Sequence, residues 1–549
     1  MFASRSVRLS AVRRHTTLAL LVAIVGGGIV PLAVPWLAAP AGAAPVNSLQ
    51  RMSLASDGSQ GASGADGSAI SADGRYVTFF SADSLVPADT NGNEDVYLRD
   101  WVAGTTELVS VALGGAQSND VSADSAVSSD GRYVAFESKA TNLVSGDTNA
   151  VYDVFVRDRV AGTTERVSMA TGGTQANGAS QHPTISADGR YVAFYSSATN
   201  LVANDTNGTS DIFLRDRTAG TTERVSIDTG GGQRTEEAFD PTMSGDGRYV
   251  AFRSEVTYAG ATILLRDRTA GTTERIDVDS TGVPANNGSY DPAISADGRY
   301  VAYYSLATNL VPGDTNAFSD VFVRDRTAST TERDSVAADG SQGNSHTYTP
   351  RISGDGRYVS FYSYATNLAG TDTNGTYDVY MHDRLAGGTE RISTDAAGTQ
   401  ANGGSLWGGI SADGRYIVFD SAASNLVAGD TNGHDDIFLK EHKPIQAPIG
   451  AAVGPEARRG GGSPSMLLTC PNPDVDPCDV STGNFTDSTT DLSIPGRGMP
   501  LEFTRTYNSY PSPAAPADGP LGYGWSYNYG MTLGVVGSTV TITEENGLN

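Results

Sequence analysis

The chain has 549 residues, and 37 Lys and Arg stand against 62 Asp and Glu, which gives a net charge of −25 at pH 7. Nucleic acid is therefore a poor candidate partner, because phosphate binding requires a concentrated basic surface. The length favours several domains or a repeat array over one globular unit. Two cysteines exclude a disulfide-rich scaffold.

Residues 1–43 predict an export signal. Four arginines and no acidic residue accompany an apolar run from Leu18 to Ala39, and Ala41-Gly42-Ala43 supplies the small residues that signal peptidase requires. An uncleaved membrane anchor is the alternative, since the run is long enough to span a bilayer. Its glycines and prolines disfavour a long helix, so we expect a secreted, extracellular or cell-surface protein with no membrane association after cleavage.

The string Ser-x-Asp-Gly-Arg-Tyr recurs seven times, at spacings of 57, 58, 58, 51, 58 and 58 residues. Its aspartates are Asp73, Asp130, Asp188, Asp246, Asp297, Asp355 and Asp413. Self-similarity at a fixed period indicates a repeat architecture.

Each unit predicts four strands, as the third unit illustrates. A short apolar segment ends at Ile185-Ser186, and an Asp-Gly turn, a strong hairpin signal, leads to a strand over 191–196. Two further strands follow over 211–215 and 223–227. The second and third strands have apolar residues at both odd and even positions, so both of their faces should be buried. Several such sheets stacked radially can bury both faces, whereas one alone cannot.

The chain ends of the array predict a closed ring. Six units have a fourth strand, but the seventh runs from Asp436 into Lys443-Pro444 without one. Residues 50–54 resemble residues 165–169 of a complete unit, so the N-terminal segment should complete the last blade beside Phe438. The predicted fold is therefore all-β, a seven-bladed β-propeller of four-stranded antiparallel blades closed by the N-terminal strand, with a small incomplete β-rich C-terminal module.

Residues 46–442 resemble the TolB-type, WD40-like (PD40) propeller repeats, whose signature is a Ser-Pro-Asp-Gly-like turn before an apolar Ala-Phe strand. Here Ala, Ser or Gly replaces the proline. Propeller relatives include peptidase gating domains and polysaccharide lyases, so the resemblance implies a scaffold rather than one activity.

The longer loops predict the ligand-binding end of the propeller. The Asp-Gly turn joins the first and second strands, and another short turn, the third turn, joins the third and fourth strands at the same end of the blade. The loops between the second and third strands (the second-to-third loops) and the loops between blades share the other end and are long. Binding residues concentrate on long loops held by a rigid scaffold. We therefore expect a protein or glycan ligand at the long-loop end.

Six of the second-to-third loops contain Asp-Thr-Asn-x-x-x-Asp, a set of oxygen ligands that suits calcium. The predicted ligands are Asp89, Asn91, Asn93, Asp95; Asp147, Asn149, Asp153; Asp205, Asn207, Asp211; Asp314, Asn316, Asp320; Asp372, Asn374, Asp378; and Asp430, Asn432, Asp436. An acid also stands at position 12, as in an EF-hand, but about 17 Å along a strand from position 7. For the residues at positions 1, 3 and 7, the alternative to calcium binding is that Asp and Asn side chains hydrogen-bond to the backbone of their own turn. Both interpretations remain open.

After His442 the composition changes. Residues 443–466 are rich in Pro, Gly and Ala and predict a linker. Residues 467–549 predict a β-rich module, in which Cys470 and Cys478 would form a local disulfide in an exported protein. Its motifs Asp479-Val480-Ser481-Thr482-Gly483-Asn484-Phe485 and Gly522-Tyr523-Gly524-Trp525-Ser526 resemble the opening module of RHS/YD-repeat proteins, which often enclose a toxin. The resemblance implies that the chain is the start of an RHS-type protein, or that the module stands alone.

No complete catalytic constellation is evident in the sequence. Gly524-Trp525-Ser526-Tyr527-Asn528 approaches a nucleophile elbow, but no histidine follows it. The histidines show no metal-ligating spacing. We therefore expect a secreted, non-enzymatic binding or adhesion propeller without catalytic residues; the alternative is an extracellular carbohydrate-active enzyme, a lyase or hydrolase, built on a propeller.

Overall fold

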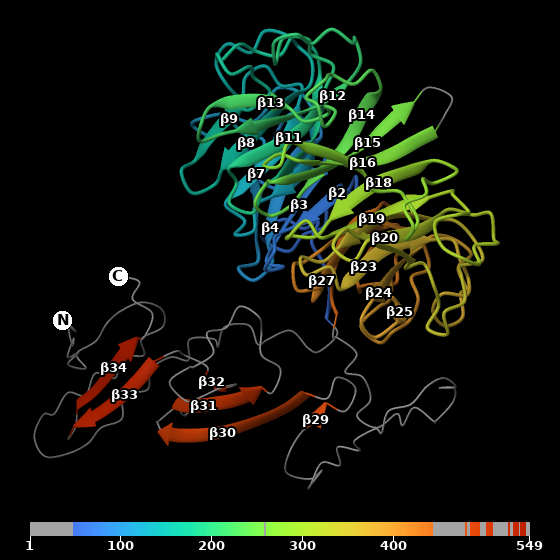
Figure 1. The fold of residues 1–549 in the computed structure, drawn as a ribbon. Coiled ribbons are helices and arrows are strands. Elements are labelled where there is room, and N and C mark those ends of the chain that lie inside the picture. Colours follow the sequence, from blue (N-terminus) through green and yellow to red (C-terminus); the bar gives the residue numbers. More distant parts are fainter. Residues whose placement is uncertain are drawn as a thin grey trace, which may run out of the picture. The chain divides into compact units, whose positions relative to one another are not determined.

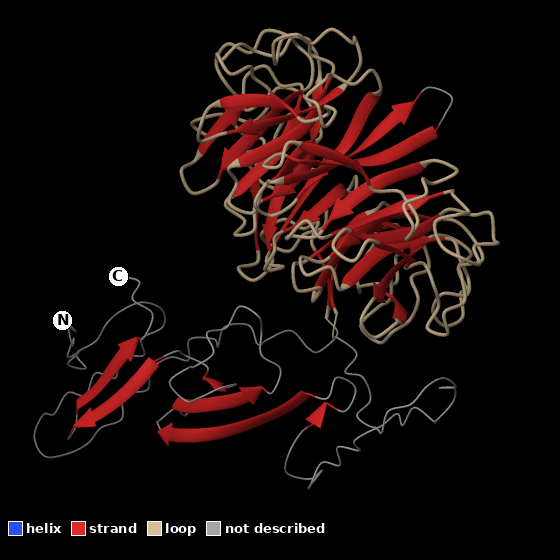
Figure 2. Ribbon diagram, viewed as in Figure 1, coloured by secondary structure: helices blue, strands red, loops and turns tan. Residues whose placement is uncertain are grey.

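The computed structural model describes residues 48–256 and 260–442, together with strand segments at 478–479, 484–494, 501–508, 525–527, 531–536 and 539–544. The chain divides into two compact units, one of Ala38–Ala451 and one of Met1–Leu37 with Ala452–Asn549. Strands joined by loops make up the described residues, and no helix occurs among them (Figure 2). Accordingly, these residues contain no helix that could cross a membrane.

Seven four-stranded antiparallel sheets form the larger unit. Blade 1 contains β2 (Asp66–Ile70), β3 (Tyr76–Ser81), β4 (Asp95–Asp100) and β5 (Thr105–Leu108). Blade 2 contains β6 (Ser122–Val127), β7 (Tyr133–Ser138), β8 (Asp153–Asp158) and β9 (Thr163–Arg166). Blade 3 contains β10 (Ser180–Ile185), β11 (Tyr191–Ser196), β12 (Asp211–Asp216) and β13 (Thr221–Arg224). Blade 4 contains β14 (Glu237–Met243), β15 (Tyr249–Val256), β16 (Gly260–Asp267) and β17 (Thr272–Arg275).

The remaining blades repeat this order. Blade 5 contains β18 (Ser289–Ile294), β19 (Tyr300–Ser305), β20 (Asp320–Asp325) and β21 (Thr330–Arg333). Blade 6 contains β22 (Thr347–Ile352), β23 (Tyr358–Ser363), β24 (Asp378–Asp383) and β25 (Gly388–Arg391). Blade 7 contains β26 (Ser405–Ile410), β27 (Tyr416–Ser421), β28 (Asp436–Glu441) and, as its outer strand, β1 (Leu49–Arg51).

The ring closes as the sequence predicts. β1 pairs antiparallel with β28, and Arg51 lies opposite Phe438. Each first strand contacts the first strand of the next blade, from β2 through β26 and back to β2, so these strands surround the axis. In Figure 1 the last blade, coloured orange, meets the blue first blade at the contact of β27 with β2. The seven-bladed, all-β prediction is thus confirmed.

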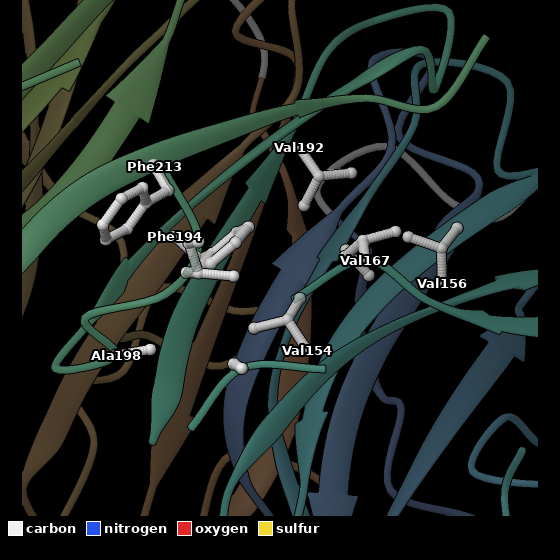
Figure 3. Packing of buried hydrophobic residues seen from close by; sticks show 10 residues of the cluster. Val154, Val156, Val167, Val192, Phe194, Ala198 and Phe213 are labelled. Atoms are coloured by element: carbon white, nitrogen blue, oxygen red, sulfur yellow. The ribbon is translucent and has the colours of Figure 1, made fainter. Parts of the chain in front are cut away.

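Hydrophobic side chains between neighbouring blades form the core. Val154 and Val156 of blade 2 pack with Val192 and Phe194 of blade 3, and each of these side chains is at most 1% exposed (Figure 3). Second and third strands are buried on both faces because a blade lies against each face.

The Asp-Gly turns help each blade fit its neighbour. Gly189 has a φ of +73°, and a Cβ on it would lie 2.1 Å from the ring of Tyr133 in the preceding blade. The turn aspartate, Asp188, accepts hydrogen bonds from Ser186 Oγ at 2.7 Å and from the Arg190 amide at 2.9 Å. These contacts explain why Ser, Asp, Gly, Arg and Tyr recur together.

The smaller unit is described only as strands. β29 (Cys478–Asp479), β30 (Asn484–Ile494), β31 (Leu501–Asn508) and β32 (Trp525–Tyr527) form one sheet, and β33 (Met531–Val536) pairs with β34 (Thr539–Glu544). The predicted signal at 1–43, the linker at 443–466 and Cys470 lie outside the described residues. The domain boundaries and the Cys470–Cys478 disulfide stay predictions.

Candidate functional site at the long-loop end

The Asp-Thr-Asn loops bring their first and seventh residues together at the long-loop end. In blade 3, Arg224 Nη1 lies 3.2 Å from Asp205 Oδ1 and 3.3 Å from Asp211 Oδ2. Asn207 Nδ2 donates to Asp211 Oδ2 at 3.2 Å, and Gln233 Nε2 donates to Asp205 Oδ1 at 2.9 Å. An arginine therefore supplies positive charge at the place where the sequence predicts calcium.

Four other loops share this arrangement. The guanidinium belongs to the fourth strand of the blade and contacts at least one carboxylate of the loop: Arg166 with Asp147 and Asp153, Arg333 with Asp314 and Asp320, Arg391 with Asp378, and Arg51 with Asp430 and Asp436. The intervening Asn149, Asn316 and Asn374 each turn the amide nitrogen, a donor, toward the seventh residue. Asp372 accepts from Gln400, and Asn432 donates to the carbonyl of Gly61.

Blade 1 lacks this arginine because Leu108 stands at the corresponding position. Asp89 and Asp95 are 3% and 0% exposed, and burial raises the pKa of Asp95. Asn91 Nδ2 donates to Asp95 Oδ2 at 3.0 Å, and the Asn93 amide donates to Asn91 Oδ1 at 2.7 Å. Among the six loops, this one has two buried carboxylates and no guanidinium in contact with them.

Blade 4 has no such loop, and its acid lies two residues beyond the end of its fourth strand, β17. Asp277 stands where the other blades have serine, and Thr262 stands where they have aspartate. Thr262 Oγ1 donates to Asp277 Oδ1 at 2.6 Å, and Arg275 Nη2 lies 2.9 Å from Asp277 Oδ2. In blade 3, Ser226 Oγ donates to Asp211, which also contacts Arg224, so blade 4 keeps the contact of hydroxyl, acid and arginine with the positions of the acid and the hydroxyl exchanged.

The acids at position 12 lie at the opposite end of the blades, as the strand geometry predicts. Asp216 accepts a hydrogen bond from Arg190 Nη2 at 2.7 Å. It also accepts from the backbone amides of Thr218 and Ala219, in the turn between the third and fourth strands. The arginine bond lowers the pKa of Asp216. These acids belong to the hairpin and are separate from the loop carboxylates.

A second set of polar residues surrounds the axis at the long-loop end. Every first strand is interrupted by a bulge near its start. The bulged residue has a positive φ in six blades, being Gly67, Asp124, His182, Asp240, Asp291 and Thr349. Asp and His are among the residues that tolerate this conformation, and glycine adopts it freely. The residue type at the bulge varies among the blades, from glycine and threonine to aspartate and histidine.

Two of these residues, Asp124 and His182, form with Glu137 of the second strand β7 what we call the axial cluster. Their ligand atoms all lie within 4.8 Å of one another, and His182 Nε2 is 3.4 Å from Asp124 Oδ2. Glu137 lies in β7, 4% exposed, and accepts from the His182 amide at 2.8 Å. Burial raises the pKa of Glu137, and the nearby charge of Asp124 adds to the effect.

Half-buried aromatic rings continue around the axis from the axial cluster. We call the following residues the aromatic belt: Tyr195, Phe239, Tyr290, Tyr304, Tyr348 and Tyr362. Tyr290 and Tyr304 stack with ring centroids 5.2 Å apart, and Tyr304 meets Tyr348 edge-on at 5.4 Å. Arg253 lies over Phe239 and next to Tyr290.

The axial cluster and the aromatic belt were not predicted from the sequence. The residue types at their positions vary among the seven repeats, whereas the Asp-Thr-Asn loops and Asp-Gly turns recur. Residues 124, 182, 240 and 291 share one position in the repeat, six residues before the aspartate of the Asp-Gly turn. An alignment of the repeats shows that the residue type changes from blade to blade at this position. The bulge that brings them together leaves no clear sequence signal.

Comparison with known proteins assigns no activity to this site. A family model described as a domain of unknown function, DUF6531, matches residues 475–549. No curated protein matches the chain.

Many solved structures match the chain at low sequence identity. TolB from Acinetobacter baumannii is 18% identical with a TM-score of 0.34, and the match covers 58% of this chain and 63% of that one, less than two thirds of its length. The β-propeller domain of the Trilobed protease from Pyrococcus furiosus is 11% identical, with coverages of 69% and 96% and a TM-score of 0.44. Pyrococcus horikoshii acylaminoacyl peptidase is 10% identical, with coverages of 81% and 57% and a TM-score of 0.42.

Proposed function

We propose that the chain is a secreted, non-enzymatic binding or adhesion propeller that holds a glycan or protein ligand at the long-loop end of its axis. The observation that carries the proposal is the aromatic belt. Its six rings, from blades 3 to 6, form one group of two and one group of four in mutual contact, and Arg253 lies against a ring of each group.

The chemistry of the belt suits a ligand with flat apolar faces and hydroxyl or amine groups. Half-buried tyrosines offer rigid ring faces together with a polar tip. Asp240 and Asp291 lie beside the belt, and Arg253 Nε contacts Asp240 Oδ2 at 2.9 Å. Such a combination of aromatic faces and a few convergent polar groups is typical of binding sites.

Binding to a glycan array and to extracellular protein extracts tests the proposal. We expect retention of a ligand without turnover, and loss of retention when Tyr304 and Tyr348 are both changed to alanine. Leu385→Ala is the matched control, because Leu385 is 78% exposed at the opposite, short-turn end. Equal retention by the double variant and the wild type would refute the assignment of the binding site.

The axial cluster favours a second candidate function, an extracellular carbohydrate-active enzyme. It places two carboxylates and an imidazole beside the aromatic belt, and these are the groups that general acid–base chemistry uses. Release of reducing ends or unsaturated products from a polysaccharide, abolished by His182→Ala, would favour the enzyme over the binding protein.

We also propose that calcium stabilises the propeller through the Asp-Thr-Asn loops, and most strongly through the loop of blade 1, where no arginine contacts the carboxylates. Millimolar calcium should raise the melting temperature and a chelator should lower it. Leu108→Arg should diminish the shift, because a guanidinium would take the cation's place, whereas Leu108→Ala should not. A melting temperature that does not respond to calcium would leave only the turn interpretation.

For the C-terminal region we propose the start of an RHS-type protein carrying a Cys470–Cys478 disulfide. The motifs quoted above support this assignment, and the family model covers the same stretch without naming a function. Non-reducing peptide mass spectrometry tests the disulfide. A downstream reading frame with Tyr-Asp repeats would support the RHS assignment, and a frame without them would oppose it.

A further inference from the structure

The ion pairs of the propeller show where negative charge is left uncompensated. Most of its buried carboxylates contact an arginine, as Asp153 contacts Arg166 and Asp216 contacts Arg190. Among the described residues, the buried carboxylates without a lysine or arginine in ion-pair contact are Asp89, Asp95, Glu137 and Asp420. Asp420 is a separate case, because burial and a hydrogen bond with Asp66 hold its pKa well above the usual range.

Glu137 lies at the centre of such an uncompensated region. Asp124 and Asp240 are nearby, and Arg253, the arginine that contacts Asp240, also contacts Glu255. The ring of His182 lies beside the two carboxylates, so the three side chains can share one cation. A buried carboxylate without a cationic partner is costly.

We propose that Asp124, Glu137 and His182 bind a divalent first-row transition metal ion at the long-loop end of the propeller axis. Ligand atoms around one such ion, at about 2.1 Å each, lie no more than about 4.2 Å apart, so shifts of about half an ångström bring all three into range. The side chains of Asp124 and His182 are 39% and 48% exposed, which gives an ion access from solvent.

The surroundings of the three ligands match the second layer of contacts that metal sites use. His182 Nδ1, the ring nitrogen other than the one next to Asp124, lies 4.0 Å from Asp240 Oδ1. A metal-bound histidine commonly donates its other ring N–H to a carboxylate. Gln181 Nε2 donates to Glu137 Oε1 at 3.2 Å, and the His182 amide donates to Oε2, so both oxygens are held while each keeps a lone pair.

The donor set decides the class of ion. An imidazole nitrogen with two carboxylates suits zinc, manganese, iron or cobalt, whereas calcium and magnesium prefer oxygen ligands throughout. This separates the axial cluster from the Asp-Thr-Asn loops, which offer oxygen atoms only. Three protein ligands also leave positions open on the ion, as in zinc sites that bind a water or a substrate.

Titration of the chelator-treated full chain with cobalt(II) tests the proposal, because coordinated cobalt has visible absorption bands that report its ligands. Millimolar calcium is present throughout, so that loop sites are filled. We expect one ion per chain, and at least about tenfold weaker binding for Glu137→Gln and His182→Ala. His434→Ala is the matched control, since His434 is an exposed histidine in the long loop of blade 7, and it should bind as the wild type does.

Equal cobalt affinity in the wild type and Glu137→Gln, or no visible bands at millimolar cobalt, would overturn the proposal. Glu137→Gln keeps the size of the side chain, so it decides the question even if His182→Ala fails to fold. The readout uses the metal alone, so its result is independent of whether a glycan or a protein binds the aromatic belt.

Discussion

Asp334 occupies a position that belongs to the hydrophobic core in every other blade. The equivalent residues are Met52, Val109, Val167, Val225, Ile276 and Ile392. Asp334 is 1% exposed, its Oδ2 atom accepts no hydrogen bond, and the nearest cation, Arg384 Nε, lies 3.4 Å away. Burial holds the pKa of Asp334 well above its usual range, so the charged form is costly in the folded state.

We expect Asp334→Val to raise the free energy of unfolding at pH 7 by about 1–3 kcal/mol, because a well-packed apolar residue replaces a poorly paired buried charge. Arg384 keeps its contact with Glu332 in the variant. Urea denaturation measures the effect, with Val225→Ile as a control for altered packing alone. A less stable valine variant would show that Asp334 has a role that its contacts do not reveal.

The pH dependence of this difference has a definite sign. A carboxyl whose pKa is higher in the folded state destabilises the fold above its unfolded pKa, and the penalty disappears on acidification. The wild type should therefore gain stability relative to Asp334→Val as the pH falls from 7 toward about 4. Paired denaturation curves across this range check the sign, and a gap that widens on acidification would contradict the prediction.

At the scale of single elements, the Asp-Gly turn shows how one repeat motif fixes both a conformation and a contact. Gly189 and Gly208 have nearly the same φ, +73° and +70°. A Cβ on Gly189 would collide with Tyr133, whereas a Cβ on Gly208 would meet no atom within 4 Å. The pair therefore separates the cost of the backbone conformation from the cost of the collision between blades.

We expect Gly208→Ala to lower the free energy of unfolding by about 1 kcal/mol, since only the left-handed conformation opposes it. Gly189→Ala should cost at least about 2 kcal/mol, because the neighbouring blade must also shift. Chemical denaturation of the two variants side by side gives the difference. Equal losses would mean that the turn does not transmit packing between blades.

Much of the element structure could be predicted because each strand carries its own local signals. Apolar residues at both odd and even positions predicted the strands that are buried on both faces, and the Asp-Gly pairs predicted the hairpins. The environment of the loop carboxylates was not predictable in the same way, because Arg224 reaches Asp205 and Asp211 from the fourth strand only once the sheet has formed. The axial cluster likewise depends on a contact between two blades, since Glu137 and His182 belong to β7 and β10.

At the scale of the molecule, the joint between blades 7 and 1 differs from the other joints. Elsewhere a glutamate on one blade contacts an arginine or a histidine on the next, as Glu165 contacts Arg217 and Glu390 contacts His442. At the closing joint, Gln50 and Trp101 take these two positions. Trp101 packs against Tyr416 with ring centroids 5.6 Å apart and donates to the carbonyl of Gly74 at 2.8 Å.

Removal of residues 1–55 should open the ring. β1 would be lost, along with the buried Met52, whose amide donates to the Ile437 carbonyl at 2.6 Å. We expect the free energy of unfolding to fall by at least about 3 kcal/mol. Removal of residues 1–43 alone should leave the melting temperature unchanged. Calorimetry of the two truncated chains distinguishes them, and equal melting temperatures would refute closure by β1.

The pairing of β1 with β28 also sets an order of events during synthesis. The first strand to leave the ribosome is the last to find its partner, since Leu49 pairs with Lys440. At typical elongation rates roughly 20–80 s separate the emergence of the two segments. During that interval β1 has no partner strand, and the blades that have already been synthesised form an open array.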